Sequence, residues 1–204
     1  MKKINIKNIS FFLLILIPLT IWSQDDWSLS KDSEGIKIWV RNYEDTRYKE
    51  YKAVTSIKTS LDKVIQELLT APRYNHNCEN GVSHLVKVSD NKDYIFYVKN
   101  DFPWPITDRD VVSKLKLNKI SNNKAELIIS SASTEVPEVK NILRVQELVG
   151  HWLLEEKNGY VQVTQQLYVN PEGTLPSFIT NSLLVLGPFR TFKNLRSTLE
   201  NLNS

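Results

Sequence analysis

The stretch DFPWPITDRDVV, residues 101–112, holds the most unusual local chemistry of the chain. Two prolines bracket Trp104 and restrict the backbone, which predicts a stiff corner. An Asp-Arg-Asp triplet follows at residues 108–110, and β-branched residues typical of a strand begin at Val111. A rigid aromatic corner before a charged strand suits a catalytic loop, a nucleic-acid contact or the rim of a cavity.

The strand after this corner, residues 109–120, alternates between two faces. One face carries Val111, Ser113, Leu115 and Leu117, and the other carries Asp110, Lys114 and Lys116. Because strand side chains alternate, we expect the first set to face the core or a cavity. Ser113 is then a candidate polar contact in an apolar wall, although such a hydroxyl often bonds to local backbone instead.

Other segments of the chain show the same alternation and predict a sheet of about eight strands in all. They are residues 35–42, 48–59, 84–89, 93–100, 124–133, 142–156 and 160–170. Short connections rich in turn-forming residues favour antiparallel neighbours. A sheet of this size should twist and curve.

Two helices are predicted. Residues 60–71 have apolar side chains at helical spacing, with Ser60 as a cap and Pro72 as the stop. A long helix that begins near Pro176 ends the chain. Its apolar stripe consists of Phe178, Val185, Phe189, Phe192, Leu195, Leu199 and Leu202. The stripe should face the sheet, and Gly187-Pro188 predicts a kink or break.

These elements predict an α+β fold in which a curved antiparallel sheet wraps around a long C-terminal helix. Apolar walls beside a gripped helix favour a cavity for an apolar ligand. The same space can instead be filled by side chains, so the architecture alone does not establish binding.

Four motifs, taken in order, carry a resemblance to a known family. They are PWPITDRDVV (103–112), GHWLLEE (150–156), YVNPEGTLPSFITN (168–181) and PFRTFKNLR (188–196). In this order they resemble the START (steroidogenic acute regulatory protein-related lipid transfer) domain family. The amino-terminal half fits in layout. It departs in RYNHNCEN (73–80), which lacks the tryptophan that family members often carry there.

The resemblance implies a helix-grip fold, like START and Bet v1 proteins, with a lipid-sized cavity and the final helix as its lid or wall. It implies binding or transfer of a lipid, sterol or other hydrophobic ligand, and no cofactor. The ligand-binding candidates are Trp104, Arg109, Val111, Ser113, Leu115, Trp152, Phe178, Val185, Phe189 and Phe192.

Several of these candidates have a structural alternative, which we prefer for Trp104 and Arg109. Trp104 either closes over a ligand or plugs a corner between strands. Arg109 either binds a lipid head group or joins Asp108 and Asp110 in an ion-pair network. Trp152 and its neighbour His151 point to opposite faces of one strand. The sequence leaves open which of the two faces the cavity.

Binding without catalysis is the main functional expectation, because the common hydrolase, zinc-protease and phosphate-loop motifs do not occur in the sequence. The alternative is a cyclase- or aromatase-like enzyme with His151 as an acid–base group. A third hypothesis is a partner-docking domain with a filled cavity and an exposed apolar patch. No metal is expected, since His76, Cys78 and His84 match no strong zinc spacing.

The first 24 residues predict a secretory signal peptide, with three lysines ahead of the apolar run 11–22. This run is short for a membrane span, and an uncleaved anchor is the alternative. Without these lysines, 23 basic residues balance 23 acidic ones, which argues against nucleic-acid binding. Residues 25–204 should form one exported, periplasmic or secreted, monomeric domain that contacts membranes transiently.

Overall fold

The computed structural model describes residues 26–70 and 81–201. These residues form one sheet in the order β1-β2-β3-β10-β9-β7-β6-β5-β4, with β8 beside β6. The strands are β1 (Ser28–Ser33), β2 (Ile36–Asn42), β3 (Lys49–Ile57), β4 (Gly81–Val88), β5 (Asp93–Asn100), β6 (Arg109–Ser121), β7 (Lys124–Ser131), β8 (Leu143–Val145), β9 (Leu148–Lys157) and β10 (Tyr160–Val169). The helices are α1 (Leu61–Leu68), the 3-10 turn η2 (Ser133–Glu135), α2 (Ser177–Asn181), the π-helical turn η3 (Ser182–Leu186) and α3 (Gly187–Asn201).

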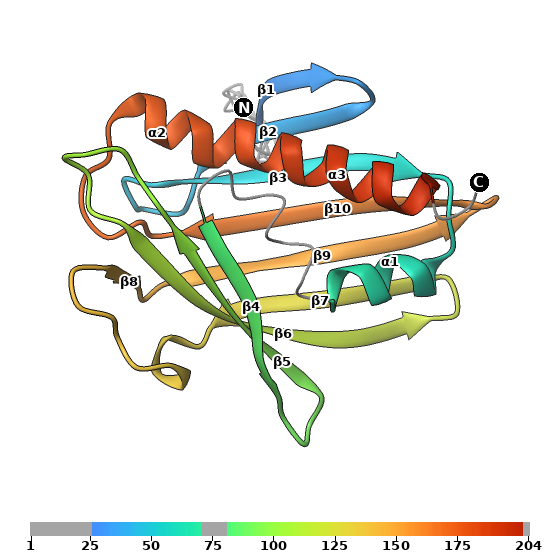
Figure 1. The fold of residues 1–204 in the computed structure, drawn as a ribbon. Coiled ribbons are helices and arrows are strands. Elements are labelled where there is room, and N and C mark those ends of the chain that lie inside the picture. Colours follow the sequence, from blue (N-terminus) through green and yellow to red (C-terminus); the bar gives the residue numbers. More distant parts are fainter. Residues whose placement is uncertain (1–25, 71–80, 202–204) are drawn as a thin grey trace, which may run out of the picture.

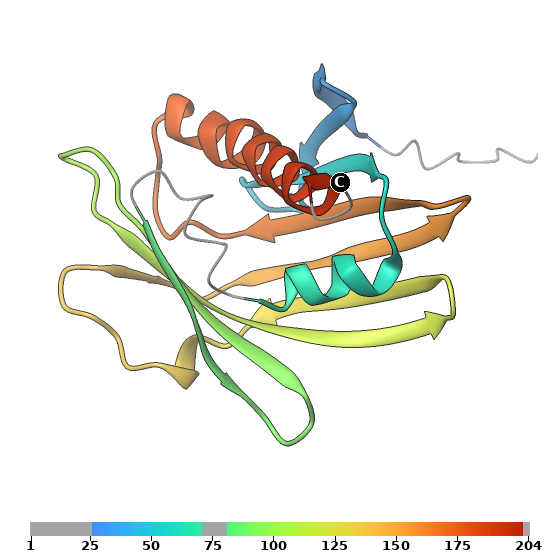
Figure 2. The ribbon, with the colours of Figure 1, turned by 45° about the vertical axis from the view of Figure 1, so that its right-hand side comes forward.

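The sheet curves around the C-terminal helix. α2, η3 and α3 form one rod that runs along β3 and β10, with α1 nearby on the same face of the sheet (Figure 1). The turned view shows the sheet bent beneath both helices (Figure 2). Phe192, Leu195 and Leu199 of α3 join the buried core between helix and sheet. The predicted α+β helix-grip fold is confirmed.

The sheet differs from the prediction at two places. β1 was not predicted, and the single strand expected over residues 142–156 is divided into β8 and β9. β8 pairs with β6 in parallel, whereas every other pair of strands among the described residues is antiparallel. A strand of three residues is too short to show the alternation on which the prediction relied.

The N-terminus of α1 is capped by a residue distant in sequence. Ser60 occupies the cap position, but its side chain makes no capping hydrogen bond. The backbone N–H of Leu61 instead donates to the Glu156 carboxylate of β9 at 2.7 Å. A carboxylate is favourable at this end of a helix. The contact therefore ties α1 to the sheet.

The C-terminal helix does not break at Gly187-Pro188 as the prediction allowed. Gly187 has helical angles, φ −59° and ψ −57°, and α3 continues from it. The preceding turn is π-helical, and such a turn inserts an extra residue into the hydrogen-bond ladder. It thereby accommodates Pro188, which cannot donate a backbone hydrogen bond.

A second layer covers part of the convex face of the sheet. Residues 132–147, here called the outer segment, leave β7, form η2 and β8, and return to β9. β8 lies in the sheet beside β6, and the residues before it cover the convex face. They help bury a small cluster around Ile95, Tyr97 and Val112. Asp110 lies on this face and is fully buried, so it does not face solvent as its charge suggested.

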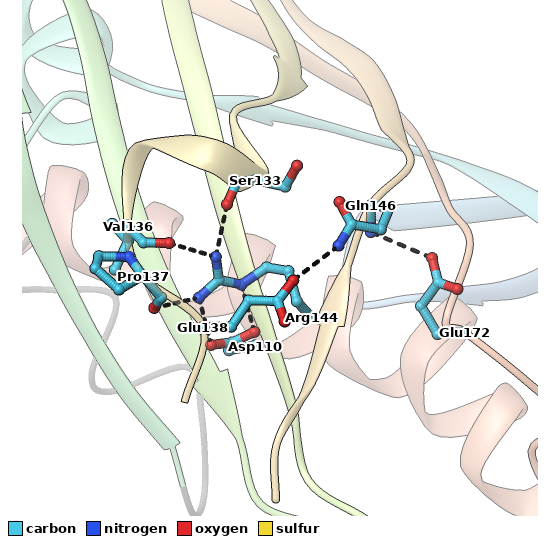
Figure 3. A network of polar contacts seen from close by, with 8 residues as sticks. All are labelled: Asp110, Ser133, Val136, Pro137, Glu138, Arg144, Gln146 and Glu172. Atoms are coloured by element: carbon cyan, nitrogen blue, oxygen red, sulfur yellow. Dashed lines mark hydrogen bonds and ion pairs between the residues drawn. The ribbon is translucent and has the colours of Figure 1, made fainter. Parts of the chain in front are cut away.

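Arg144 anchors the outer segment to β6 (Figure 3). Its Nε and Nη2 donate to the two carboxylate oxygens of Asp110 at 2.6 and 2.9 Å. The remaining N–H groups donate to the carbonyls of Ser133, Val136 and Pro137. These hydrogen bonds use all five guanidinium donors. The hydrogen bond to Asp110 raises the pKa of Arg144 above its ordinary value.

Replacement of Arg144 by methionine should destabilise the protein strongly. Asp110 and three carbonyls would stay buried without their donor, and breaking a buried pair costs about 3–5 kcal/mol. Urea denaturation measures this loss in the free energy of unfolding. The matched control is Lys119→Met, which removes an exposed ion pair with Asp62 and should change stability little. Equal stability of the two variants would contradict the assigned role of Arg144.

Candidate functional site

A cavity of about 550 Å³ lies between the concave face of the sheet and the C-terminal helix. This volume falls within the range of about 300–1,000 Å³ that is usual for small-molecule sites. Strands β3 to β10 contribute side chains to its wall, as do the loops at one end of the sheet. The space between sheet and helix is therefore not filled by side chains, in contrast to the partner-docking hypothesis.

The sheet side of the cavity is mainly apolar. Its largest side chains include Phe96, Leu115, Ile129, Leu148 and Trp152. Alternation along the strands places them all on the concave face. Val111, Ser113 and Leu115 line the cavity as the β6 pattern predicted, and so do Arg109 and Trp152.

The helix side of the cavity was not predicted. It consists of Thr180, Leu183, Leu184, Gly187, Pro188 and Thr191. These residues follow the spacing i, i+3, i+4, i+7, i+8 and i+11, so they form one face of the rod. The face was missed because half of its side chains are small or polar. Helical spacing from Leu184 was the signal that could have found it.

The predicted helix candidates lie elsewhere. Val185 and Phe192 are buried in the core beside the cavity, and Phe189 packs against that core while its ring lies under the Lys31 ammonium. Phe178 is 63% exposed at the start of α2. None of the four lines the cavity. Phe189 and Phe192 thus hold the helix against the core, and other residues of the rod face the open space.

Trp152 joins the cavity to the core. Its ring stacks on Phe192, with centroids 5.5 Å apart and an interplanar angle of 20°. Two residues earlier, a Cβ on Gly150 would lie 2.3 Å from the Gln166 carbonyl oxygen. Only glycine therefore fits at that point of β9, where the backbones of β9 and β10 approach closely.

One polar pair lies in the apolar wall beside Trp152. The Tyr51 hydroxyl donates to Gln165 Oε1 at 2.8 Å, and both side chains are buried and line the cavity. Gln165 is the cross-strand neighbour of Trp152. A ligand in the cavity would therefore meet a hydrogen-bonding group at this depth.

Arg109 lies at the other end of the cavity and is 6% exposed. Its Nε donates to the Pro171 carbonyl at 3.1 Å, Nη2 to the Glu172 carbonyl at 3.3 Å, and Nη1 to the Thr107 carbonyl. Phe102 lies beside the guanidinium, 5.4 Å from ring centroid to Cζ. Burial lowers the pKa of Arg109 below its ordinary value. Arg109 thus connects β6 to the loop that leads into α2.

The predicted ion-pair network of Asp108, Arg109 and Asp110 is wrong. Asp108 pairs with Lys99 at 3.3 Å and accepts the Phe102 backbone N–H. Asp110 pairs with Arg144 on the opposite face of β6. Alternation sends Arg109 and Asp110 to opposite faces of the strand, so the two neighbours cannot pair with each other.

Trp104 is 92% exposed and does not line the cavity. The prediction that it plugs a corner between strands is therefore wrong, and it does not cover the cavity in this structure. The two prolines hold the β5–β6 loop, residues 101–108, so that the indole points away from the core. The peptide bond between Trp104 and Pro105 is cis.

His151 does not reach the cavity. It pairs across the sheet with Gln166 and Ile128, on the face opposite Trp152. His76 and Cys78 lie outside the described residues. Within residues 26–70 and 81–201, no group of three or more His, Cys, Asp or Glu side chains is placed to hold a metal ion.

Comparison with known proteins agrees with this architecture. The START domain family model matches residues 19–204. The chain belongs to the START domain family. An uncharacterized protein of Pseudomonas aeruginosa is 34% identical over 180 residues, which cover 86% of this chain and 88% of that protein.

Solved structures of the family share the fold. The STAR-related lipid transfer protein of Xanthomonas axonopodis is 32% identical, with a TM-score of 0.76 over 86% of this chain and 99% of that one. Human StAR-related lipid transfer protein 5 has a TM-score of 0.72 at 13% identity, over 90% of each chain. At that identity, the human protein supports the fold alone.

Two phenylalanines of the helix distinguish its core face from its exposed face. Phe192→Ala should lower the free energy of unfolding by about 3–5 kcal/mol, because the fully buried ring stacks on Trp152. Phe178→Ala removes the same atoms from an exposed site and should cost about 0.5 kcal/mol or less. Urea denaturation of both variants provides the comparison. A larger loss for Phe178→Ala would contradict the assignment of the two faces.

Proposed function

We propose that this START domain binds a hydrophobic ligand between its sheet and its C-terminal helix, and transfers that ligand. The observation that carries the proposal is the largely apolar cavity of about 550 Å³. The name of the Xanthomonas protein, a STAR-related lipid transfer protein, supports the same function. The protein would act as a monomer that encloses the ligand in its cavity. Burial of the apolar surface of the ligand would provide most of the binding free energy.

The proposed activity is binding without catalysis. The described cavity wall contains no His, Cys, Asp or Glu side chain. General acid–base chemistry usually draws on such groups, placed within hydrogen-bond reach of the substrate. His151, the candidate for a cyclase-like reaction, lies on the other face of β9. These observations favour a protein that binds and carries its ligand over an enzyme that converts it chemically.

A bulky side chain in the cavity should prevent ligand uptake. Leu184 lines the cavity, whereas Leu186 is exposed two residues later on the same rod. Leu184→Trp should fill part of the cavity and abolish uptake of a fluorescent fatty acid or sterol. Leu186→Trp is the matched control and should bind like the unmodified protein. Titration of the fluorescent lipid into each variant measures the difference.

Circular dichroism and urea denaturation must first show that both tryptophan variants fold. Uptake by folded Leu184→Trp at the unmodified affinity would mean that the ligand binds elsewhere. Failure of the unmodified protein to take up any fatty acid, sterol or phospholipid probe would contradict the proposed function itself.

We further propose that the mature domain is exported and meets membranes at the end where α2 begins. The lysine-rich and apolar leader supports export. No helix in the described part of the chain is long and apolar enough to cross a bilayer. Exposed Trp104 and Phe178 lie in the β5–β6 loop and at the start of α2, at the same end of the molecule in both ribbon views (Figures 1 and 2). Exposed aromatic residues favour the membrane interface.

Trp104→Ala should slow ligand transfer between vesicles several-fold without changing ligand affinity. The side chain is exposed, so its loss should not affect the cavity or the fold. Tyr160→Ala is the control, since this exposed aromatic residue lies at the opposite end of β10. Transfer of a fluorescent lipid from donor to acceptor vesicles measures the rate. Equal transfer rates for the two variants would contradict the proposal that Trp104 contacts the membrane.

A further inference from the structure

The charged side chains in the described part of the cavity wall have one sign. The described lining residues include Arg47, Lys49 and Arg109, and no aspartate or glutamate. The chain as a whole is nearly balanced, with 26 basic and 23 acidic residues. An excess of one sign inside a largely apolar cavity is therefore a local property of this site. Such an arrangement raises the local concentration of oppositely charged ligands.

The three cations lie at one end of the cavity. Arg109 begins β6 opposite Asn100, the last residue of β5. Lys49 begins β3, where the partner strand β10 ends and leads into Pro171. Arg47 lies just before it, in the loop between β2 and β3. Trp152, Gln165 and Leu115 lie further along the strands, where the lining residues that the structure describes carry no charge.

Arg109 is buried without a carboxylate partner among the described residues. Three of its N–H groups donate to backbone carbonyls, which leaves two of the five available. The neighbouring carboxylates are held elsewhere, Asp108 by Lys99 and Asp110 by Arg144. The Asp108 carboxylate acts on Arg109 through space and partly offsets the effect of burial on its pKa, but it makes no direct contact. A buried cation with no carboxylate in direct contact favours the binding of an anion.

We propose that the ligand is an anionic amphiphile, with a carboxylate or phosphate group at the Arg109 end and its hydrocarbon chain against Trp152 and Leu115. Arg109 supplies planar, charge-assisted donors, and Lys49 and Arg47 add charge at the surface. This proposal rests on the proposed function and specifies its ligand class. A neutral sterol or alcohol would fill the apolar part but would leave buried Arg109 without an anion in direct contact.

The test compares ligands with the same oleyl chain and different head groups. Oleate supplies a carboxylate, oleoyl lysophosphatidate a phosphate, and oleyl alcohol neither. Each is titrated below its aggregation concentration against the mature protein loaded with the uncharged dye Nile red. Oleate or the lysophosphatidate should displace the dye at a Kd at least about tenfold lower than the alcohol, the ratio expected for one charge-assisted hydrogen bond. The stronger of the two anions identifies the head group.

Substitutions of the three basic residues test whether their charge causes the preference for an anionic ligand. Lys49→Gln and Arg47→Gln should reduce the preference for the anion and leave the affinity for oleyl alcohol unchanged. Arg109→Gln should reduce the same preference most strongly. Lys116→Gln is the matched control, because this lysine is exposed on the other face of β6. Should Arg109→Gln fail to fold, the exposed Lys49→Gln and Arg47→Gln variants still test the charge, together with the salt dependence of oleate binding.

The outcomes separate this proposal from the general function. Equal displacement by alcohol and anions would overturn the anionic ligand class while leaving hydrophobic binding intact. An anion preference that survives in Lys49→Gln, Arg47→Gln and Arg109→Gln would also overturn it. No displacement by any of the three ligands would contradict the proposed function itself.

Discussion

The fold depends on how the C-terminal helix covers the concave face of the sheet. Phe192 on Trp152, followed by Leu195 and Leu199, seals one part of that face against α3. Earlier in the same rod, the face toward the sheet includes Thr180, Gly187 and Thr191 in addition to two leucines, and the cavity lies in front of it. A single rod thus closes the core with wholly apolar side chains and forms a cavity wall in which leucines lie among small or polar residues.

The segment 101–112 organises the end of the cavity from both sides of the sheet. Arg109 points to the concave face and holds the carbonyls of Pro171 and Glu172, in the loop that leads into α2. Asp110 points to the convex face and holds Arg144 of the outer segment. The backbone N–H of Gln146 donates to the Glu172 carboxylate, which joins these two systems (Figure 3). Arg109 and Asp110 are adjacent and oppositely charged, yet each holds a different segment: Arg109 the loop into α2, and Asp110 the outer segment.

Much of the fold could be predicted from the sequence, because alternation over long strands is a strong signal. The same signal correctly assigned Val111, Ser113 and Leu115 to the cavity wall. The helix wall was missed because apolar size was taken as the guide, and the open face carries Thr180, Gly187 and Thr191 instead. The Asp110–Arg144 pair was missed because its partner lies on a three-residue parallel strand, which has no periodicity to detect. The signal available was Arg144, a single charge between the apolar residues Leu143 and Val145.

The central claim is that this chain carries one hydrophobic molecule between its sheet and its C-terminal helix. Non-denaturing mass spectrometry of the mature protein, purified without detergent from the cells that make it, tests this claim most directly. We expect a complex of one ligand per chain, with an added mass that disappears after extraction with organic solvent. A spectrum of the bare chain alone, unchanged by incubation with oleate, lysophosphatidate or a sterol, would contradict it.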